Sequence, residues 1–261
     1  MLFHHAAIET LENAKAFFVR QFSTDLIGIY VHGSLVTNCF NPRLSDVDFI
    51  VVIRKPLTPE QRHDIIDFSI ELDQNAPGKG VEYSIVTQDQ IDQFTYPTPN
   101  ELTFSYHSLD HHTREELYTL PQVPDPDLAA HFSIIFQRGV VLVGRPIKQV
   151  FRPIPKRAFM EALISDAEYI KTMITRKPFY GVLNLCRIYA FKIDGQLLSK
   201  KEGGLWALKH ESVNQMYHPL IEKALEDYKT QMSDNWNNIA LQDFFKDMYC
   251  KLLTSAAVEG S

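Results

Sequence analysis

The order of strand-like and helix-like segments constrains this chain most: they alternate through its first third, and only helix-like segments follow residue 152. Compact β-rich runs predict strands at residues 26–32, 48–53 and 81–87. Apolar residues at helical spacing predict helices at 8–22 and 59–75, the second with Thr58 as N-cap and Pro59 in its first turn. Such alternation predicts a short mixed sheet with flanking helices.

The second half of the chain has a different character. The prolines at 146, 153 and 155 lie where β-like runs end, after a predicted helix from Asp127 to Gly139 and a short strand at 140–143. Helical periodicity then predicts helices at residues 156–175, 182–193, 205–209, 219–232 and 239–253. We therefore expect an α+β fold class, with a mixed domain at residues 1–152 and an all-helical domain at 153–261.

Composition excludes several classes of protein. With 45% hydrophobic residues among 261, the chain can bury one large core or two modest ones. Its apolar runs fall far short of the ~20 residues that span a bilayer. Its N-terminus lacks the pattern of an export signal, so we expect a cytoplasmic protein with no membrane partner. The three cysteines form no close pair, and the net charge of −6 argues against a nucleic-acid partner.

The residues with most chemical information follow the first predicted strand. Gly33 and Ser34 begin a turn into a short helix, where amides at a helix start can bind phosphate oxygens. Asp46 and Asp48 come two residues apart at the start of the next strand, so their carboxylates project from one face. Carboxylates ~4 Å apart repel by about 4 kcal/mol at an effective dielectric near 20. Mg²⁺ removes that repulsion and bridges nucleotide phosphates, so this stretch predicts a metal and phosphate site.

A third carboxylate, Glu82, lies on the predicted strand at 81–87. Residues alternate along a strand, so Glu82 faces away from Val81 and Tyr83. If this strand lies beside the strand that carries Asp48, Glu82 points toward the metal and can accept a proton from an acceptor hydroxyl. Glu82 is therefore a candidate general base and a candidate metal ligand.

The set Gly33, Ser34, Asp46, Asp48 and Glu82 matches the Gly-Ser, Asp-x-Asp and later carboxylate of the DNA polymerase β-like nucleotidyltransferases. Within them, the chain resembles the bacterial aminoglycoside adenylyltransferases of the streptomycin/spectinomycin type. That resemblance continues in order through residues 96–97, 125–129, 142–144, 182–187, 199–207 and 224–228. It implies an N-terminal nucleotidyltransferase domain and a C-terminal helical domain, with ATP and the antibiotic bound between them. It also implies Mg²⁺-assisted transfer of AMP to a hydroxyl, with release of pyrophosphate.

The resemblance assigns roles in the N-terminal domain. Gly33, Ser34 and Ser45 would bind the triphosphate of ATP. Asp46 and Asp48 would hold Mg²⁺, which the family uses as a pair of ions, and Glu82 would be the general base.

In the helical domain, Arg187 and Lys200 fall where the family places cations on the nucleotide phosphates, and Tyr228 falls where a tyrosine contacts the nucleotide. Arg187 stands in an otherwise apolar helix, where an unpaired guanidinium is costly, so it needs an anionic partner. A structural salt bridge is the alternative to a phosphate. For Lys200, residue type alone allows a solvated loop equally well.

The acceptor site is where this sequence departs from the resemblance. The known resistance enzymes typically have Glu-Phe-x-x-Gly-Glu-Trp, and the Trp helps to wall the drug site; here His107 ends the corresponding run. Lys177 stands where a family Asp is expected to meet ammonium groups of the drug. Losing two charge-assisted hydrogen bonds of about 1.5–3 kcal/mol each predicts that streptomycin is a poor acceptor. Spectinomycin or another hydroxylated compound is then preferred.

The predicted function is therefore adenylylation of a small hydroxylated acceptor, an aminoglycoside or aminocyclitol antibiotic, by a monomeric enzyme of the kind associated with antibiotic resistance. One alternative is an enzyme of the same superfamily that acts on a lincosamide, another metabolite or a protein hydroxyl. The second alternative is a non-catalytic nucleotide-binding protein. The presence of Asp46, Asp48 and Glu82 together counts against that second alternative.

Overall fold

The computed structural model describes residues 3–230 and 235–254. The chain divides into two compact units, Met1–Phe159 and Met160–Ser261. Helix α9 (Lys156–Met173) begins in the first unit and ends in the second. No helix in the described parts of the chain is both long and apolar enough to cross a bilayer.

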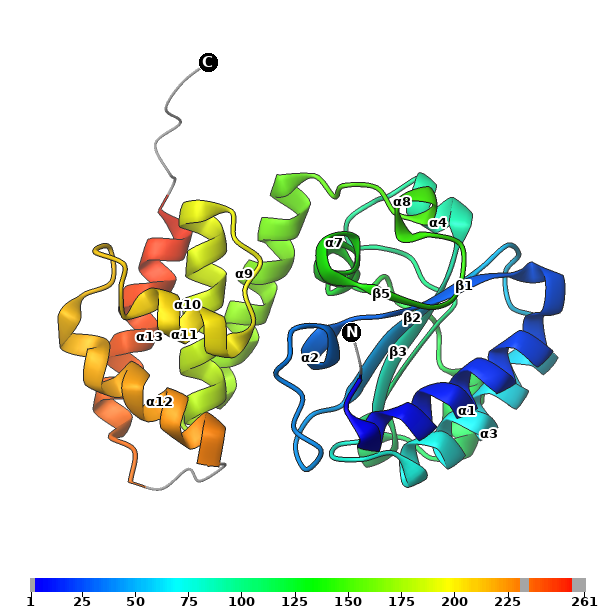
Figure 1. The fold of residues 1–261 in the computed structure, drawn as a ribbon, viewed down its shortest axis with the longest axis horizontal. Helices are drawn as coiled ribbons and strands as arrows, with labels where there is room; N and C mark the ends of the chain where they lie inside the picture. The colour runs from blue at the N-terminus through cyan, green and yellow to red at the C-terminus, as the bar shows by residue number, and fades with distance from the viewer. Residues whose placement is uncertain (1–2, 231–234, 255–261) are drawn as a thin grey trace, which may run out of the picture. The chain divides into compact units, whose positions relative to one another are not determined.

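A five-stranded sheet forms the centre of the first unit, with strand order β4-β3-β2-β1-β5 (Figure 1). Its strands are β1 (Leu26–Val31), β2 (Val47–Ile53), β3 (Val81–Thr87), β4 (Leu102–Ser105) and β5 (Val140–Gly144). β2 and β3 are parallel, and all other neighbouring pairs are antiparallel. The sheet is therefore mixed, and β1, β2 and β3 lie on the runs that the sequence predicted.

Helices of the first unit connect and cover these strands. They are α1 (His5–Phe22), α2 (Gly33–Val36), α3 (Pro59–Asn75), α4 (Gln88–Asp92), α5 (Ser108–His111), α6 (Arg114–Thr119), α7 (Leu128–Arg138) and α8 (Ile147–Val150). Thr58 and Gln61 form a reciprocal capping box at the start of α3, with Pro59 in its first turn, so the predicted start of this helix is confirmed.

Alternation along the strands gives the sheet two buried faces. Phe49 and Tyr83 belong to the face that packs against α1 and α3. Ile50 and Val52 belong to the opposite face, which packs against α7 and α8 (Figure 1). Side chains at the ends of β2 and β3 on this second face are consequently free to build a site where the apolar packing ends.

The segment between β3 and α7 differs from the sequence prediction. It contains strand β4 and the short helices α4, α5 and α6, where the sequence predicted no helix or strand. In β4 only Leu102 and Phe104 are buried, and two apolar positions are too few to distinguish a strand from a loop by pattern.

Helix α10 (Pro178–Asp194) is central to the second unit. It packs against α11 (Lys200–Ala207), α12 (His218–Thr230) and α13 (Asn238–Leu253). Gly203 allows a close approach of α11, because a Cβ at this position would lie 2.7 Å from the Arg187 Cα. The predicted helical character of this half is confirmed; the predicted end of one helix at Met232 lies outside the described residues.

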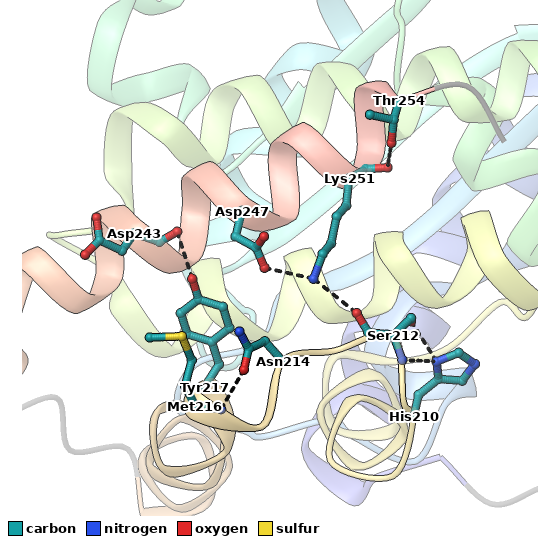
Figure 2. Close-up of polar contacts among 9 residues, drawn as sticks. All are labelled: His210, Ser212, Asn214, Met216, Tyr217, Asp243, Asp247, Lys251 and Thr254. Atoms are coloured by element: carbon teal, nitrogen blue, oxygen red, sulfur yellow. Dashed lines mark hydrogen bonds and ion pairs between the residues drawn. The ribbon is translucent and has the colours of Figure 1, made fainter.

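The segment between α11 and α12 is tied to α13, as Figure 2 shows. The Lys251 ammonium forms an ion pair with Asp247 at 2.9 Å and donates to the Ser212 carbonyl at 3.1 Å. Lys192, on α10, donates to the carbonyls of residues 251, 252 and 254 at the C-terminal end of α13. A cation at this position is favoured by the helix dipole, and burial lowers the pKa of Lys192.

Candidate active site

Three carboxylates converge at the start of β2 and β3. Asp48 and Glu82 are direct register partners on these parallel strands, and Asp46 immediately precedes β2. One carboxylate oxygen from each lies within 4.8 Å of the others. The strand pairing on which the proposed role of Glu82 depended is therefore present.

Gly33 makes room for this arrangement. Its φ is +64°, and a Cβ at this position would lie 1.8 Å from Asp48 Oδ2. Glycine is thus required at this position for two reasons: the backbone is in the left-handed region, and the Asp48 carboxylate occupies the space where a Cβ would lie. The preceding residue, His32, donates its backbone N–H to the Asp48 carbonyl at 3.1 Å.

The two serines of the motif have different surroundings. Ser34 Oγ is buried and has no hydrogen-bond partner among residues 3–230 and 235–254. A buried hydroxyl without a partner costs free energy, which a ligand oxygen would recover. Ser45 Oγ accepts from the Asn41 N–H at 3.0 Å, so this serine also shapes the loop before β2.

The environment of Glu82 changes its acidity. Burial raises the pKa of the Glu82 carboxyl, His131 opposes this effect, and Asp46 adds to it. Three hard oxygen donors at this spacing, with Asp48 only 9% exposed, fit a divalent cation such as Mg²⁺.

The structure places the other predicted residues in the helical unit. The Arg187 guanidinium lies 3.5 Å from the Asp166 carboxylate, so Asp166 is an anionic partner of the kind that the apolar helix required. The buried Nε of Arg187 has no hydrogen-bond partner in the described part of the chain. Lys200 Nζ lies 4.8 Å from the centre of the Tyr180 ring. The Tyr228 ring packs edge-on against Phe179.

The two acceptor-site candidates lie in different units. His107 is exposed at the start of α5, and its Nδ1 is 2.9 Å from Asp110. Lys177 is the exposed N-cap residue of α10.

Sequence reasoning missed one pair of residues near the carboxylates. The ring of His32 is buried, and its centroid lies 4.6 Å from that of His131 on α7. Burial, and then His131, hold the pKa of His32 well below its usual range. No spacing signal connects these two positions, because only the folding of α7 over the sheet brings them together.

Comparison with known proteins agrees with this geometry. Residues 11–102 match the family model of the nucleotidyltransferase domain, and residues 149–250 match that of the aminoglycoside adenylyltransferase C-terminal domain. The chain is 27% identical over 228 residues to an aminoglycoside (3'') (9) adenylyltransferase of Escherichia coli, covering 82% of each chain. It is 21% identical over 205 residues to a spectinomycin 9-adenylyltransferase of Enterococcus faecalis, covering 75% of this chain and 78% of that one.

A solved structure shares the fold. It is that of spectinomycin adenyltransferase AAD(9) from Enterococcus faecalis with ATP and spectinomycin, with a TM-score of 0.78 at 20% sequence identity. The match covers 94% of this chain and 98% of that one. With a nucleotidyltransferase domain followed by the C-terminal domain that marks this group, the chain belongs to the aminoglycoside adenylyltransferases, enzymes of the nucleotidyltransferase superfamily.

Proposed function

We propose that this protein transfers AMP from ATP to a hydroxyl of an aminoglycoside or aminocyclitol antibiotic and releases pyrophosphate. The observation that carries the proposal is the convergence of Asp46, Asp48 and Glu82 within 4.8 Å. The names of the related proteins, which act on aminoglycosides and spectinomycin, support this class of acceptor.

Asp46 and Asp48 are proposed to hold Mg²⁺ together with Glu82. When bound, Mg²⁺ neutralises phosphate charge and stabilises the transferring phosphoryl group. The Gly33–Ser34 turn is proposed to bind triphosphate oxygens, and the buried Ser34 Oγ, which has no hydrogen-bond partner among the described residues, supports this role. The close approach of backbone that Gly33 permits favours the same ligand.

Glu82 is proposed to accept the proton of the acceptor hydroxyl. The hydroxyl oxygen forms a bond to the α-phosphorus of ATP, the bond from that phosphorus to the bridging oxygen breaks, and pyrophosphate leaves. Burial raises the pKa of the Glu82 carboxyl, which makes its carboxylate a stronger base than an exposed glutamate.

The helical unit is proposed to contribute cations to the nucleotide. Arg187 and Lys200 would bind phosphate oxygens, and Tyr228 would contact the nucleotide. The buried Nε of Arg187 has no hydrogen-bond partner in the parts of the chain that the structure describes, and this supports a ligand-binding role in addition to the ion pair with Asp166.

For the acceptor, we propose a preference for spectinomycin over streptomycin, based on His107 and Lys177. Lys177 is a cation at an exposed helix start, and it would repel the guanidinium groups of streptomycin. Two lost charge-assisted hydrogen bonds would weaken streptomycin by several hundredfold or more, at about 1.5–3 kcal/mol each.

Pyrophosphate release from ATP and Mg²⁺, measured across a panel of antibiotics, tests the function. The panel should contain spectinomycin, streptomycin and a lincosamide, with a matched reaction lacking acceptor. Spectinomycin-dependent release is expected. If pyrophosphate were released only when the lincosamide is present, the acceptor would be a lincosamide and not an aminoglycoside or aminocyclitol. If the protein bound nucleotide but released no pyrophosphate with any acceptor, a non-catalytic nucleotide-binding protein would be supported. Streptomycin turnover with a micromolar KM would refute the preference and leave adenylyl transfer intact.

A further inference from the structure

Two polar side chains with buried atoms lie one turn apart on α10, in the second unit of the chain. Asn184 is 0% exposed, and neither its Oδ1 nor its Nδ2 has a hydrogen-bond partner among residues 3–230 and 235–254. Arg187 follows three residues later, and its buried Nε also lacks a partner within those ranges. Residues three apart share one face of a helix, with Cβ atoms about 5–6 Å from each other. Donors and an acceptor without partners are thus buried together on one face of α10.

These two side chains have complementary hydrogen-bonding groups. Side chains on a helix slant toward its N-terminus, so the stem of Arg187 runs back over the turn that carries Asn184. The Nε–H of an arginine can only donate, and the carboxamide oxygen of an asparagine accepts. Rotation of the two side chains would therefore join Arg187 Nε to Asn184 Oδ1.

Packing leaves the guanidinium as the part of Arg187 that can move. Gly203 of α11 packs directly on the backbone of α10, since a Cβ at this glycine would lie 2.7 Å from the Arg187 Cα and from its N. The Asp166 carboxylate lies 3.5 Å from the guanidinium. That distance is longer than the about 2.7–2.9 Å of a charge-assisted hydrogen bond. The backbone of Arg187 is thus fixed, whereas its guanidinium is held only by a long ion pair.

Asparagine is an unfavourable residue at position 184 for folding alone. A buried carboxamide without hydrogen bonds costs free energy, and an apolar side chain of similar shape would avoid that cost. The neighbours along the helix, Leu183 and Leu185, are fully buried and apolar. The cost is recovered when the carboxamide forms a hydrogen bond in the ligand-bound protein.

We propose that Asn184 is a positioning residue, whose carboxamide oxygen accepts from Arg187 Nε when nucleotide binds and so turns the other guanidinium nitrogens toward the phosphates. This proposal rests on the proposed contact between Arg187 and the nucleotide. An arginine with its Nε fixed presents its remaining donors in one plane, which suits the bidentate binding of a phosphate. Asn184 keeps the guanidinium in place once a phosphate has drawn it away from Asp166.

Calorimetry of Mg²⁺-ATP binding by the full chain, without acceptor, tests this role. Asn184→Leu keeps the branching of the side chain and removes both polar groups, so affinity should fall about 10-fold. Its Tm should rise by roughly 2–4 °C, because the unpaired polar atoms are gone. A residue that serves only the fold would not lose affinity while it gains stability. Asn184→Ala, which cannot overpack the core, should lose affinity to the same extent.

Cys186→Ala is the matched control for these substitutions. Cys186 is as fully buried on α10 as Asn184. It is two residues further along, about 200° around the helix, and so belongs to another face. We expect Cys186→Ala to lower Tm and to leave the affinity for Mg²⁺-ATP unchanged. An equal loss of affinity in this control would mean that the packing of α10 alone decides binding, which overturns the proposal.

A double-mutant cycle shows whether Asn184 acts through Arg187. Arg187→Met should weaken Mg²⁺-ATP binding on its own, and Asn184→Leu should add little to that loss in the double variant. An equal further loss in the Arg187→Met background would overturn the proposal. Wild-type affinity in folded Asn184→Leu and Asn184→Ala would overturn it as well.

A resonance of Arg187 reports its orientation directly. With isotopically labelled arginine, the Nε–H resonance of Arg187 is identified by its loss in Arg187→Met. At saturating Mg²⁺-ATP we expect this resonance to move in the wild type and to move less in Asn184→Leu. The same movement in both proteins would overturn the positioning role.

These measurements also separate the proposal from the proposed function. If the cycle and the resonance behave as expected but no acceptor yields pyrophosphate, adenylyl transfer is refuted and the role of Asn184 in nucleotide binding stands. If Arg187→Met binds Mg²⁺-ATP as tightly as the wild type, the contact between Arg187 and the nucleotide is refuted, and the role of Asn184 is overturned with it.

Discussion

The two regions that carry the proposed site residues differ in how their charges are compensated. At the start of β2 and β3, Asp46, Asp48 and Glu82 bring three carboxylates within 4.8 Å, so like charges are held together. In the helical unit, Arg187 lies 3.5 Å from Asp166, so opposite charges are held together. Repulsion within the first set opposes folding, and a bound cation would relieve it, whereas the attraction in the second pair needs no ligand.

If Asp46, Asp48 and Glu82 hold a cation as proposed, their charges serve a ligand, whereas the charges of the α9–α10 ion pair serve the fold. Neutralising a charge should therefore have opposite effects on stability in the two regions. The following substitutions test that contrast.

The largest expected effect is on the reaction itself. Glu82→Gln keeps the shape of the side chain and removes the proton acceptor, so kcat should fall by about 10²- to 10⁴-fold. Binding of Mg²⁺-ATP, measured by calorimetry, should weaken but persist, because Asp46 and Asp48 still supply two anionic ligands to the cation. Glu71→Gln, at an exposed position on α3, is the control and should leave kcat unchanged. Near-normal turnover of Glu82→Gln would place the general base elsewhere.

Asp46→Asn should change stability and binding in opposite directions. Removing one of three like charges should stabilise the ligand-free protein by about 1 kcal/mol, which raises Tm by roughly 2–4 °C for a chain of this size. Affinity for Mg²⁺-ATP should fall, because the cation loses an anionic ligand. Thermal unfolding and calorimetry measure the two effects, with Asp64→Asn as the exposed control on α3. A lower Tm without ligand would contradict the contrast between the two regions.

Arg187→Met should act on stability with the opposite sign. Asp166 would lose the cation that lies 3.5 Å away, and this pair is only about one-quarter exposed. We expect the ligand-free protein to lose about 1 kcal/mol of stability. Thermal unfolding in the absence of nucleotide measures this loss. An unchanged or raised Tm would show that the ion pair contributes nothing and that Arg187 is held for a ligand alone.

The last effect is a pH dependence that arises in the first unit. Burial holds the pKa of His32 well below its usual range, whereas in the unfolded chain a histidine binds a proton near pH 6.5. The free energy of unfolding should therefore fall as pH drops below about 6.5, by at most about 1.4 kcal/mol per pH unit from this residue. His32→Asn should reduce that slope in urea unfolding measured from pH 7 to pH 5, and an equal slope in both proteins would contradict the assignment.

The features that could be predicted from the sequence are those determined by residues close together along the chain. Strand β3 could be predicted because Val81, Tyr83 and Ile85 alternate with residues of the opposite face. The carboxylate site could be predicted because Asp46 and Asp48 stand two residues apart at the start of a strand, a spacing that holds like charges together and that few purely structural roles require.

Other features depend on contacts between distant segments. An anionic partner for Arg187 could be expected from its apolar helix, but Asp166 as that partner required the packing of α9 on α10. The pair of His32 and His131 had no local signal at all, because each is a lone histidine until α7 covers the sheet.

The register of β2 and β3 has an evolutionary consequence. Asp48 lies opposite Glu82 on one face, and their neighbours Phe49 and Tyr83 stack with centroids 4.7 Å apart on the other. A slip of one residue would turn Glu82 into the apolar core beside α1 and α3 and move Tyr83 to the opposite face, so alignment of the carboxylates and folding are lost together. Descendant sequences therefore inherit this alignment for as long as they fold, while an exposed position such as His107, which we propose to line the acceptor site, can diverge without that cost.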